Sequence, residues 1–145
     1  MTEPLRCFED FSPGETIDLG SRRVGRDEIL AFAERYDPQP MHLDEAAGRA
    51  SMLGGLSASG WHTVGLFMRL LCDNLLLKSR SLGSPGIERL RWLKPVYPDD
   101  LLSARAEVTG TRASRSRPGI GIVGFRFALL NGAGEPVMTM ENAIM

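Results

Sequence analysis

Asp37 and His42 are the two side chains whose types and spacing best suit acid–base chemistry. They lie five positions apart within residues 36–44, where Pro38 and Pro40 each remove a backbone N–H and restrict the residue before them. These prolines predict a short, stiff loop in place of a regular element. A carboxylate and an imidazole on such a loop can converge on one water molecule, so that one group takes a proton and the other returns it.

Spacing alone also allows a simpler interpretation of this pair. Aspartate is common as a turn residue beside proline at the end of a helix, and His42 could be an ordinary surface histidine. Because short motifs carry a real risk of false matches, the surrounding residues have to decide between the two interpretations.

Residues 36–44 as a whole resemble the signature of the MaoC-like hydratases, the (R)-specific enoyl-CoA hydratase branch of the hotdog-fold proteins. That signature reads approximately Gly-Asp-x-Asn-Pro-apolar-His-x-Asp/Glu, and the matching positions are Asp37, Pro40, Met41, His42 and Asp44. Tyr36 stands where glycine is usual, and Gln39 where asparagine is usual. The match favours a functional site over the simpler interpretation.

The resemblance implies reversible hydration of a trans-2-enoyl-CoA thioester to a 3-hydroxyacyl-CoA. Asp37 and His42 would share the attacking water, and the sequence leaves open which of them is the base. The N–H of Gly60, at the start of a helix, would stabilise the charge that develops on the thioester oxygen. A glycine chosen only for backbone shape is the alternative at that position.

Further implications concern the substrate, its carrier and the assembly. The candidate substrate-binding residues are Gln39, Met41, Leu53, Gly55, Leu56 and Ser59. We expect coenzyme A as part of the substrate, no redox cofactor and no metal. The resemblance also implies a homodimer or a higher homo-oligomer, and an open curled sheet leaves edges that a second copy can cover.

Three helical patterns surround the candidate pair. From Asp27 the apolar residues Ile29, Phe32, Ala33 and Tyr36 recur at helical spacing and predict one buried stripe, which Pro38 ends. Residues 44–50 predict a short helix with Asp44 in its first turn. After the glycine-rich residues 53–60, a helix from Trp61 to about Lys78 is apolar nearly all round, which predicts a central helix wrapped by a sheet.

The second half of the chain is predicted to be β-structure. Residues 102–109 alternate between apolar and polar side chains, and residues 87–93, 120–130 and 137–144 form further predicted strands. Short extended pieces are expected on either side of a turn at Ser12–Glu15. This order predicts an α+β fold in a single domain, residues 1–145. The resemblance makes it a hotdog fold, a curled antiparallel sheet around a long central helix.

Two features of the remaining sequence bear on partners. The segment 94–101 resembles the family's Pro-x-x-x-Gly-Asp segment, with Asp99 in place of the usual glycine. The loop that contains Arg112, Arg115 and Arg117 is either simply solvated or binds the phosphates of coenzyme A.

Composition excludes some classes of function. The 145 residues carry a formal net charge of −1, so bulk electrostatics do not suggest a nucleic-acid or membrane partner. The N-terminus lacks the pattern of a signal peptide, and no apolar run reaches the roughly 18 residues that span a bilayer. We therefore expect a cytoplasmic protein.

Rival functions remain at this stage. A hotdog acyl-CoA thioesterase shares the fold and the carrier, and a non-catalytic acyl-binding hotdog subunit would need only a pocket. The spacing of His42, Asp44 and His62 does not support a metal site, and we expect His62 and Asp44 to have structural roles.

Overall fold

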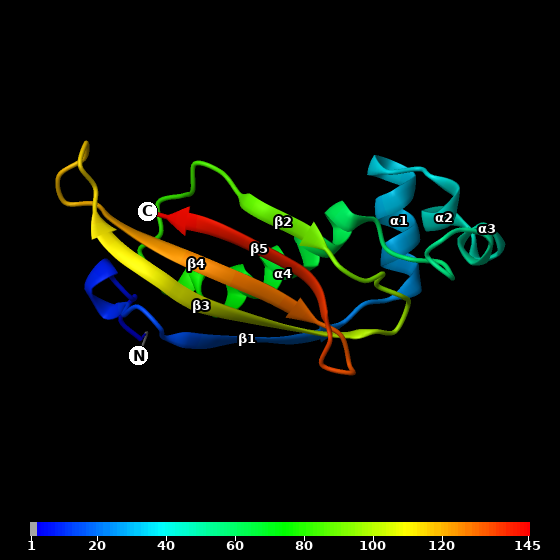
Figure 1. The fold of residues 1–145 in the computed structure, drawn as a ribbon, viewed down its shortest axis with the longest axis horizontal. Helices are drawn as coiled ribbons and strands as arrows, with labels where there is room; N and C mark the ends of the chain where they lie inside the picture. The colour runs from blue at the N-terminus through cyan, green and yellow to red at the C-terminus, as the bar shows by residue number, and fades with distance from the viewer. Residues whose placement is uncertain (1–2) are drawn as a thin grey trace.

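The computed structural model describes residues 3–145 and shows a twisted antiparallel sheet with one long helix behind it (Figure 1). The five strands have the order β1-β3-β4-β5-β2, so β1 and β2 are the two edges. Their bounds are β1 Thr16–Arg23, β2 Glu88–Trp92, β3 Leu101–Ala113, β4 Gly121–Leu130 and β5 Pro136–Ile144. Every neighbouring pair is antiparallel, as the sequence predicted.

Helix α4 (Gly60–Asn74) packs one face on the sheet. The ring of Phe67 lies 5.0 Å from that of Phe127 on β4, and Phe127 stacks on Phe125 at 5.3 Å. These three aromatic side chains are buried at the centre of the core, where they bring the helix and the sheet together. The predicted α+β arrangement of a curled antiparallel sheet around a long central helix is confirmed.

Two details of the central helix were predicted wrongly. The sheet does not wrap all of α4, since Trp61 is 61% exposed and Met68 is 45% exposed. The helix also ends at Asn74, and Leu76–Lys78 form a separate 3-10 turn, η2. The apolar excess of this segment therefore reflects both a buried face and a second, uncovered face.

The predicted strands are present, and two of them differ in extent from the prediction. Strand β3 continues four residues beyond the alternating pattern, past a register shift between Val108 and Gly110, to Ala113. Strand β2 is shorter than expected, and it shifts register between Glu88 and Arg91. A bulge of this kind hides the two-residue period that sequence patterns depend on.

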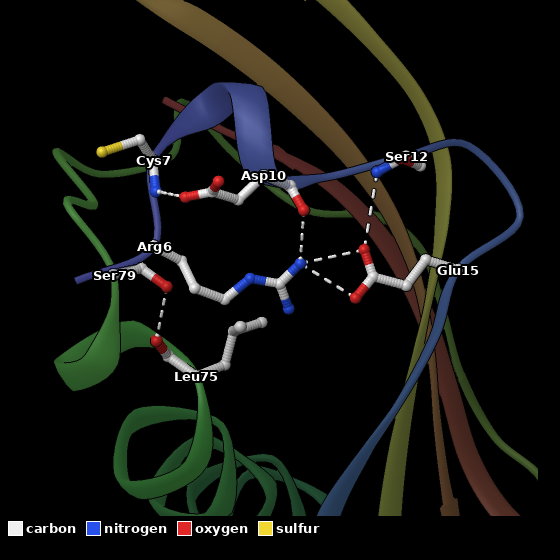
Figure 2. Close-up of polar contacts among 7 residues, drawn as sticks. All are labelled: Arg6, Cys7, Asp10, Ser12, Glu15, Leu75 and Ser79. Carbon is white, nitrogen blue, oxygen red and sulfur yellow. Dashed lines mark hydrogen bonds and ion pairs between the residues drawn. The ribbon is translucent and has the colours of Figure 1, made fainter. Parts of the chain in front are cut away.

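The segment before β1 contains a 3-10 turn, η1 (Phe8–Asp10), where a short extended piece was expected. Figure 2 shows why the chain turns there: the Asp10 carboxylate accepts the N–H of Cys7, 2.8 Å away, and the guanidinium of Arg6 donates to the Asp10 carbonyl and to Glu15. In the same view Ser79 donates to the carbonyl of Leu75 at 2.7 Å, just beyond the end of α4.

Three short helices gather at one end of the sheet, near the start of α4 (Figure 1). They are α1 Arg26–Tyr36, α2 Pro40–Leu43 and α3 Glu45–Ala50. On α1 the buried stripe is narrower than predicted, because Tyr36 is 67% exposed, although its ring centroid lies 5.2 Å from that of Phe32. Within residues 3–145 we find no helix both long and apolar enough to cross a membrane.

Candidate active site

The structure brings Asp37 and His42 together at the end of the sheet that carries the short helices. Asp37 directly follows Tyr36, the last residue of α1, and its N–H donates to the carbonyl of Ala33 at 2.9 Å. The Nε2 atom of His42 lies 3.5 Å from Oδ2 of Asp37, and the exposed fractions of these side chains are 7% and 19%. The pair is therefore largely shielded from solvent, as acid–base groups need to be if they are to keep a fixed geometry.

His42 lies on a helical turn, and in this respect the predicted loop without regular structure was wrong. Pro40 is the first residue of α2, a position that tolerates proline because the first N–H of a helix has no partner inside the helix. Pro38 thus follows the end of α1 and Pro40 begins α2, so the two prolines do not exclude helix from residues 36–44.

Both oxygens of the Asp37 carboxylate accept a hydrogen bond. The hydroxyl of Ser59 donates to Oδ2 at 2.6 Å, and the side-chain amide of Gln39 donates to Oδ1 at 2.7 Å. These bonds, that of Ser59 first, hold the pKa of Asp37 below its ordinary value, and the charge of His42 adds to the effect while burial opposes it. Asp37 is therefore an anion at neutral pH with a fixed orientation.

The His42 ring is fixed from its other side. Its Nδ1 atom lies 2.8 Å from the carbonyl oxygen of Ser57, and a carbonyl can only accept. The Nδ1–H of His42 consequently donates to Ser57, so the neutral ring carries its lone pair on Nε2, facing Asp37. The backbone N–H of Ser57 in turn donates to the carbonyl of Met41 at 3.4 Å.

Gly60 begins α4 beside these groups, and its packing explains why it is glycine. A Cβ at this position would lie 2.6 Å from the indole ring of Trp92, whose Nε1–H donates to the Gly60 carbonyl at 2.9 Å. This contact supports the backbone-shape interpretation. Within the described residues the N–H of Gly60 has no hydrogen-bond acceptor, so it also remains free for a ligand.

The other predicted substrate-binding residues have structural contacts. The carbonyl of Leu53 accepts the hydroxyl of Tyr97, and Gly55 packs against the same ring. Gly48 lies so close to Gly55 that a Cβ there would be 2.4 Å from the Gly55 backbone. Leu56 is 1% exposed and belongs to the core. Substrate contacts by Met41, Leu53, Gly55 and Leu56 stay predictions.

Two residues with expected structural roles have them. The carboxylate of Asp44 caps α3 by accepting the N–H of Ala47 at 2.9 Å. His62 stacks on Phe32 with ring centroids 4.9 Å apart, and burial lowers the pKa of its imidazole. Among residues 3–145, no three His, Cys, Asp or Glu side chains gather closely enough to hold a metal ion.

Sequence reasoning missed the part that Ser59 and Ser57 play in the pair. Ser59 was expected to contact substrate, yet its hydroxyl binds Asp37, which is 22 positions earlier in the chain. The carbonyl of Ser57 was not considered, because any residue could supply it. Only the small residues of the 53–60 segment hinted at a close approach of two backbones.

Comparisons with known proteins bear on the fold and on the family. A solved structure of a MaoC-like dehydratase from Rhodospirillum rubrum is 40% identical, with a TM-score of 0.87 over 94% of both chains. The (R)-hydratase from A. caviae involved in PHA biosynthesis is 27% identical, with a TM-score of 0.73 over 94% of this chain and 97% of that one. These structures confirm the expected hotdog fold.

A longer relative and a family model complete the comparison. Mesaconyl-CoA hydratase from Cereibacter sphaeroides is 29% identical over 99% of this chain, which spans only 42% of that protein. The model of the MaoC-like domain matches residues 10–123, the part of the chain that contains the Asp37–His42 pair. The chain belongs to the MaoC-like domain family.

Proposed function

We propose that this chain is a hydro-lyase that adds water reversibly to the double bond of a trans-2-enoyl-CoA and forms a 3-hydroxyacyl-CoA. The observation that carries the proposal is the Asp37–His42 pair, in which both side chains are fixed by hydrogen bonds from the chain itself. Membership of the MaoC-like family and similarity to an (R)-hydratase and to mesaconyl-CoA hydratase support a hydratase or dehydratase role.

His42 is the base in this proposal. The Asp37 carboxylate, whose pKa is lowered and whose oxygens each accept a hydrogen bond, is a weak base that is well suited to orient a water molecule. The lone pair on Nε2 of His42 accepts a proton from that water as its oxygen attacks C3 of the enoyl group. The adjacent carboxylate stabilises the imidazolium that forms.

The proton then returns to the substrate. Attack at C3 moves electrons through C2 to the thioester oxygen, and the N–H of Gly60 donates to the negative charge there. The imidazolium of His42 gives its proton to C2 on the same face, which restores the neutral ring. Water is thereby added with no change in the overall oxidation state of the substrate, and coenzyme A acts only as its carrier.

The proposal includes a homodimer joined through β2. This strand is an edge of the sheet, and the rings of Trp92 and Trp61 meet there at 5.4 Å while both side chains stay about half exposed. A second copy related by a two-fold axis would pair its own β2 antiparallel to this one and cover both indoles. Light scattering in solution tests this, because a mass of 15.9 kDa, that of one chain, would contradict it.

Loss of absorbance of the conjugated thioester measures the proposed reaction directly. With a short and a medium trans-2-enoyl-CoA, we expect turnover by the natural chain. Asp37→Asn and His42→Ala should each lower kcat by about 10²–10⁴-fold, because each removes one of the two groups that handle the water proton. Circular dichroism should show that both variants remain folded.

Two results would contradict the proposal. The first is undiminished turnover in either variant, which would show that this pair does not carry out the proton transfer. The second is release of free thiol from a saturated acyl-CoA together with no loss of the enoyl absorbance, which would favour the thioesterase.

A further inference from the structure

His62 is a buried histidine that the proposed mechanism does not use. It lies in the first turn of α4, two residues after Gly60, and its side chain belongs to the buried face of that helix, with 8% exposed. Its Nδ1 atom is buried and forms no hydrogen bond with any residue from 3 to 145. A buried polar atom without a partner costs free energy that an apolar side chain would not cost, so an imidazole at this position calls for an explanation.

A row of aromatic contacts connects His62 with the end of α1. The imidazole lies nearly parallel to the ring of Phe32 on α1, with an interplanar angle of 9° and ring centroids 4.9 Å apart. The Phe32 ring lies 5.2 Å from that of Tyr36, the last residue of α1, and Asp37 follows directly. Three rings thus lead from the first turn of α4 to the residue that precedes the catalytic carboxylate.

The stack of His62 on Phe32 bears on the geometry of the site, because the two sides of the site belong to different helices. Asp37 follows α1, whereas the free N–H of Gly60 belongs to α4, and α1 lies beside the start of α4 (Figure 1). The hydrogen bond from Ser59 fixes one oxygen of the Asp37 carboxylate. The stack fixes the helix that carries the backbone of Asp37, so the distance from Asp37 to Gly60 depends on it.

The surroundings of His62 suit a neutral ring and oppose an imidazolium. Burial is the largest cause of the lowered pKa of His62, which Glu28 on α1 opposes and Arg22 on β1 reinforces. Glu28 and Arg22 form an ion pair at 3.1 Å, and the other Glu28 oxygen accepts the N–H of Gly25 at 2.9 Å. On α4 itself no charged side chain precedes Arg69, and the N-terminus of a helix carries partial positive charge.

A proton on His62 can therefore be accommodated only when the ring reaches water. The Asp37 carboxylate offers no unused oxygen, since both of its oxygens already accept hydrogen bonds. Because Phe32 covers one face of the imidazole, hydration requires Phe32, and with it α1, to move away from α4. Such a movement displaces Asp37 from Gly60, and a displacement of about 1 Å in a catalytic group costs on the order of 10²-fold in rate.

We propose that His62 is a positioning residue of the hydratase: its neutral ring, stacked on Phe32, holds Asp37 at the working distance from Gly60, and protonation of the ring opens this contact and lowers kcat. The proposal rests on the proposed hydration of an enoyl thioester, and in it His62 acts through α1 without touching the substrate. The loss should begin as pH falls below about 6.5, the ordinary pKa of histidine. Below that pH the opened, hydrated form takes up a proton while the closed form still resists it, so the equilibrium moves toward the opened form.

The pH profile of kcat with a trans-2-enoyl-CoA tests this proposal, because protonation of His42 and protonation of His62 should each abolish turnover. Once both titrate, log kcat of the natural chain should fall by about two units per pH unit on the acidic limb. His62→Phe keeps a ring for the stack and has no proton to accept. Its log kcat should therefore fall by about one unit per pH unit, from His42 alone, and its kcat at about pH 8 should stay close to that of the natural chain.

Two further variants complete the test. His62→Ala lacks the stack at every pH, so its kcat at about pH 8 should be lower by roughly 10–10²-fold with little change in KM. Arg69→Gln removes an exposed side chain on the same helix, and as the matched control it should keep both the natural kcat and the natural acidic limb. Identical acidic limbs in the natural chain and His62→Phe would overturn the proposal, as would full kcat in His62→Ala. If His62→Ala does not fold, the comparison of the natural chain with His62→Phe decides.

Hydrogen exchange separates this proposal from the proposed function, because it needs no substrate. After correction for the intrinsic pH dependence of exchange, the amides of α1 should lose protection between about pH 7 and pH 5 in the natural chain and keep it in His62→Phe. A natural chain that opens in this way and hydrates no enoyl thioester contradicts only the proposed function. An active natural chain whose acidic limb and α1 protection match those of His62→Phe contradicts only the role of His62.

Discussion

The connection from α1 to α4, residues 37–59, and the strands β3, β4 and β5 are held together in different ways. In the connection, side-chain polar bonds fix the backbone and the catalytic candidates together, as in the bonds from Ser59 to Asp37 and from His42 to Ser57. In the strands, backbone ladders and apolar side chains such as Phe127 do this work. Chemistry and stability therefore depend on different residues, and single substitutions can change one without the other.

A substitution in the strands should have the largest effect on stability and leave the chemistry alone. Phe127 is fully buried between Phe67 and Phe125, so Phe127→Ala should lower the free energy of unfolding by about 3–5 kcal/mol. Urea unfolding measures this, with exposed Arg126→Ala as the control. Its surface ion pairs predict a loss of at most about 1 kcal/mol. A fall in kcat of the folded Phe127→Ala protein would break the separation.

At Gly60, in contrast, a substitution should affect kcat more than stability. Gly60→Ala puts a Cβ 2.6 Å from the Trp92 ring, and the shift needed to relieve it moves the N–H that is proposed to bind the thioester oxygen. A displacement of about 1 Å in such a group costs on the order of 10²-fold in kcat. Gly65 lies on the same helix with open space around it, so Gly65→Ala should keep kcat and raise stability by about 0.5–1 kcal/mol.

Ser59→Ala should change the titration of Asp37 more than it changes the fold. The Ser59 hydroxyl is the largest cause of the lowered pKa, so its removal should raise the pKa of Asp37 toward its ordinary value. NMR titration of the carboxyl group measures the shift, and Ser59→Thr, which keeps a hydroxyl, should preserve most of it. An unchanged pKa in Ser59→Ala would show that the 2.6 Å bond does not control the carboxylate.

The same substitution predicts a definite dependence of stability on pH. A carboxylate whose pKa is lower in the folded state stabilises the fold above its unfolded pKa of about 3.9, and that stabilisation is lost as pH falls through the folded pKa. The natural chain should therefore exceed Ser59→Ala in stability at pH 6. The difference should shrink once the pH falls below about 3.9 and Asp37 of the natural chain begins to take up its proton.

Much of this architecture was predictable from short-range patterns, and the rest was not for physical reasons. Period-two alternation found β3, and helical spacing found α1, because burial on one face imposes those periods. The bond from Ser59 to Asp37 joins positions with no fixed spacing, so no local pattern encodes it. Tyr36 was assigned to a buried stripe although it is exposed, because its apolar ring and its spacing do not reveal whether another part of the chain covers it.

Gln39 and Asp99 show how departures from the family pattern are accommodated. Gln39 keeps the amide and still reaches Asp37, at 2.7 Å. Asp99 stands where the family usually has glycine, and its φ of 71° lies in the left-handed region that favours glycine. The turn is nevertheless present, and the Asp99 N–H donates to the carbonyl of Val24 at 2.8 Å. A residue with a Cβ is less favourable than glycine in this backbone conformation.

The smallest effect follows from this turn. Left-handed backbone costs a residue with a Cβ roughly 1–2 kcal/mol, partly offset in glycine by its greater loss of freedom on folding. Asp99→Gly should therefore raise the free energy of unfolding by about 0.5–1 kcal/mol. Asp99→Ala should lower it, since alanine lacks the local hydrogen bonding that lets aspartate tolerate this region. Thermal unfolding of the three proteins should give the order of stability glycine, aspartate, alanine, and kcat should be equal in all of them.

A change of kcat would show that the turn also sets the geometry of the catalytic pair. The turn supports residues 37–59 through the bond from the Ala58 N–H to the Val96 carbonyl.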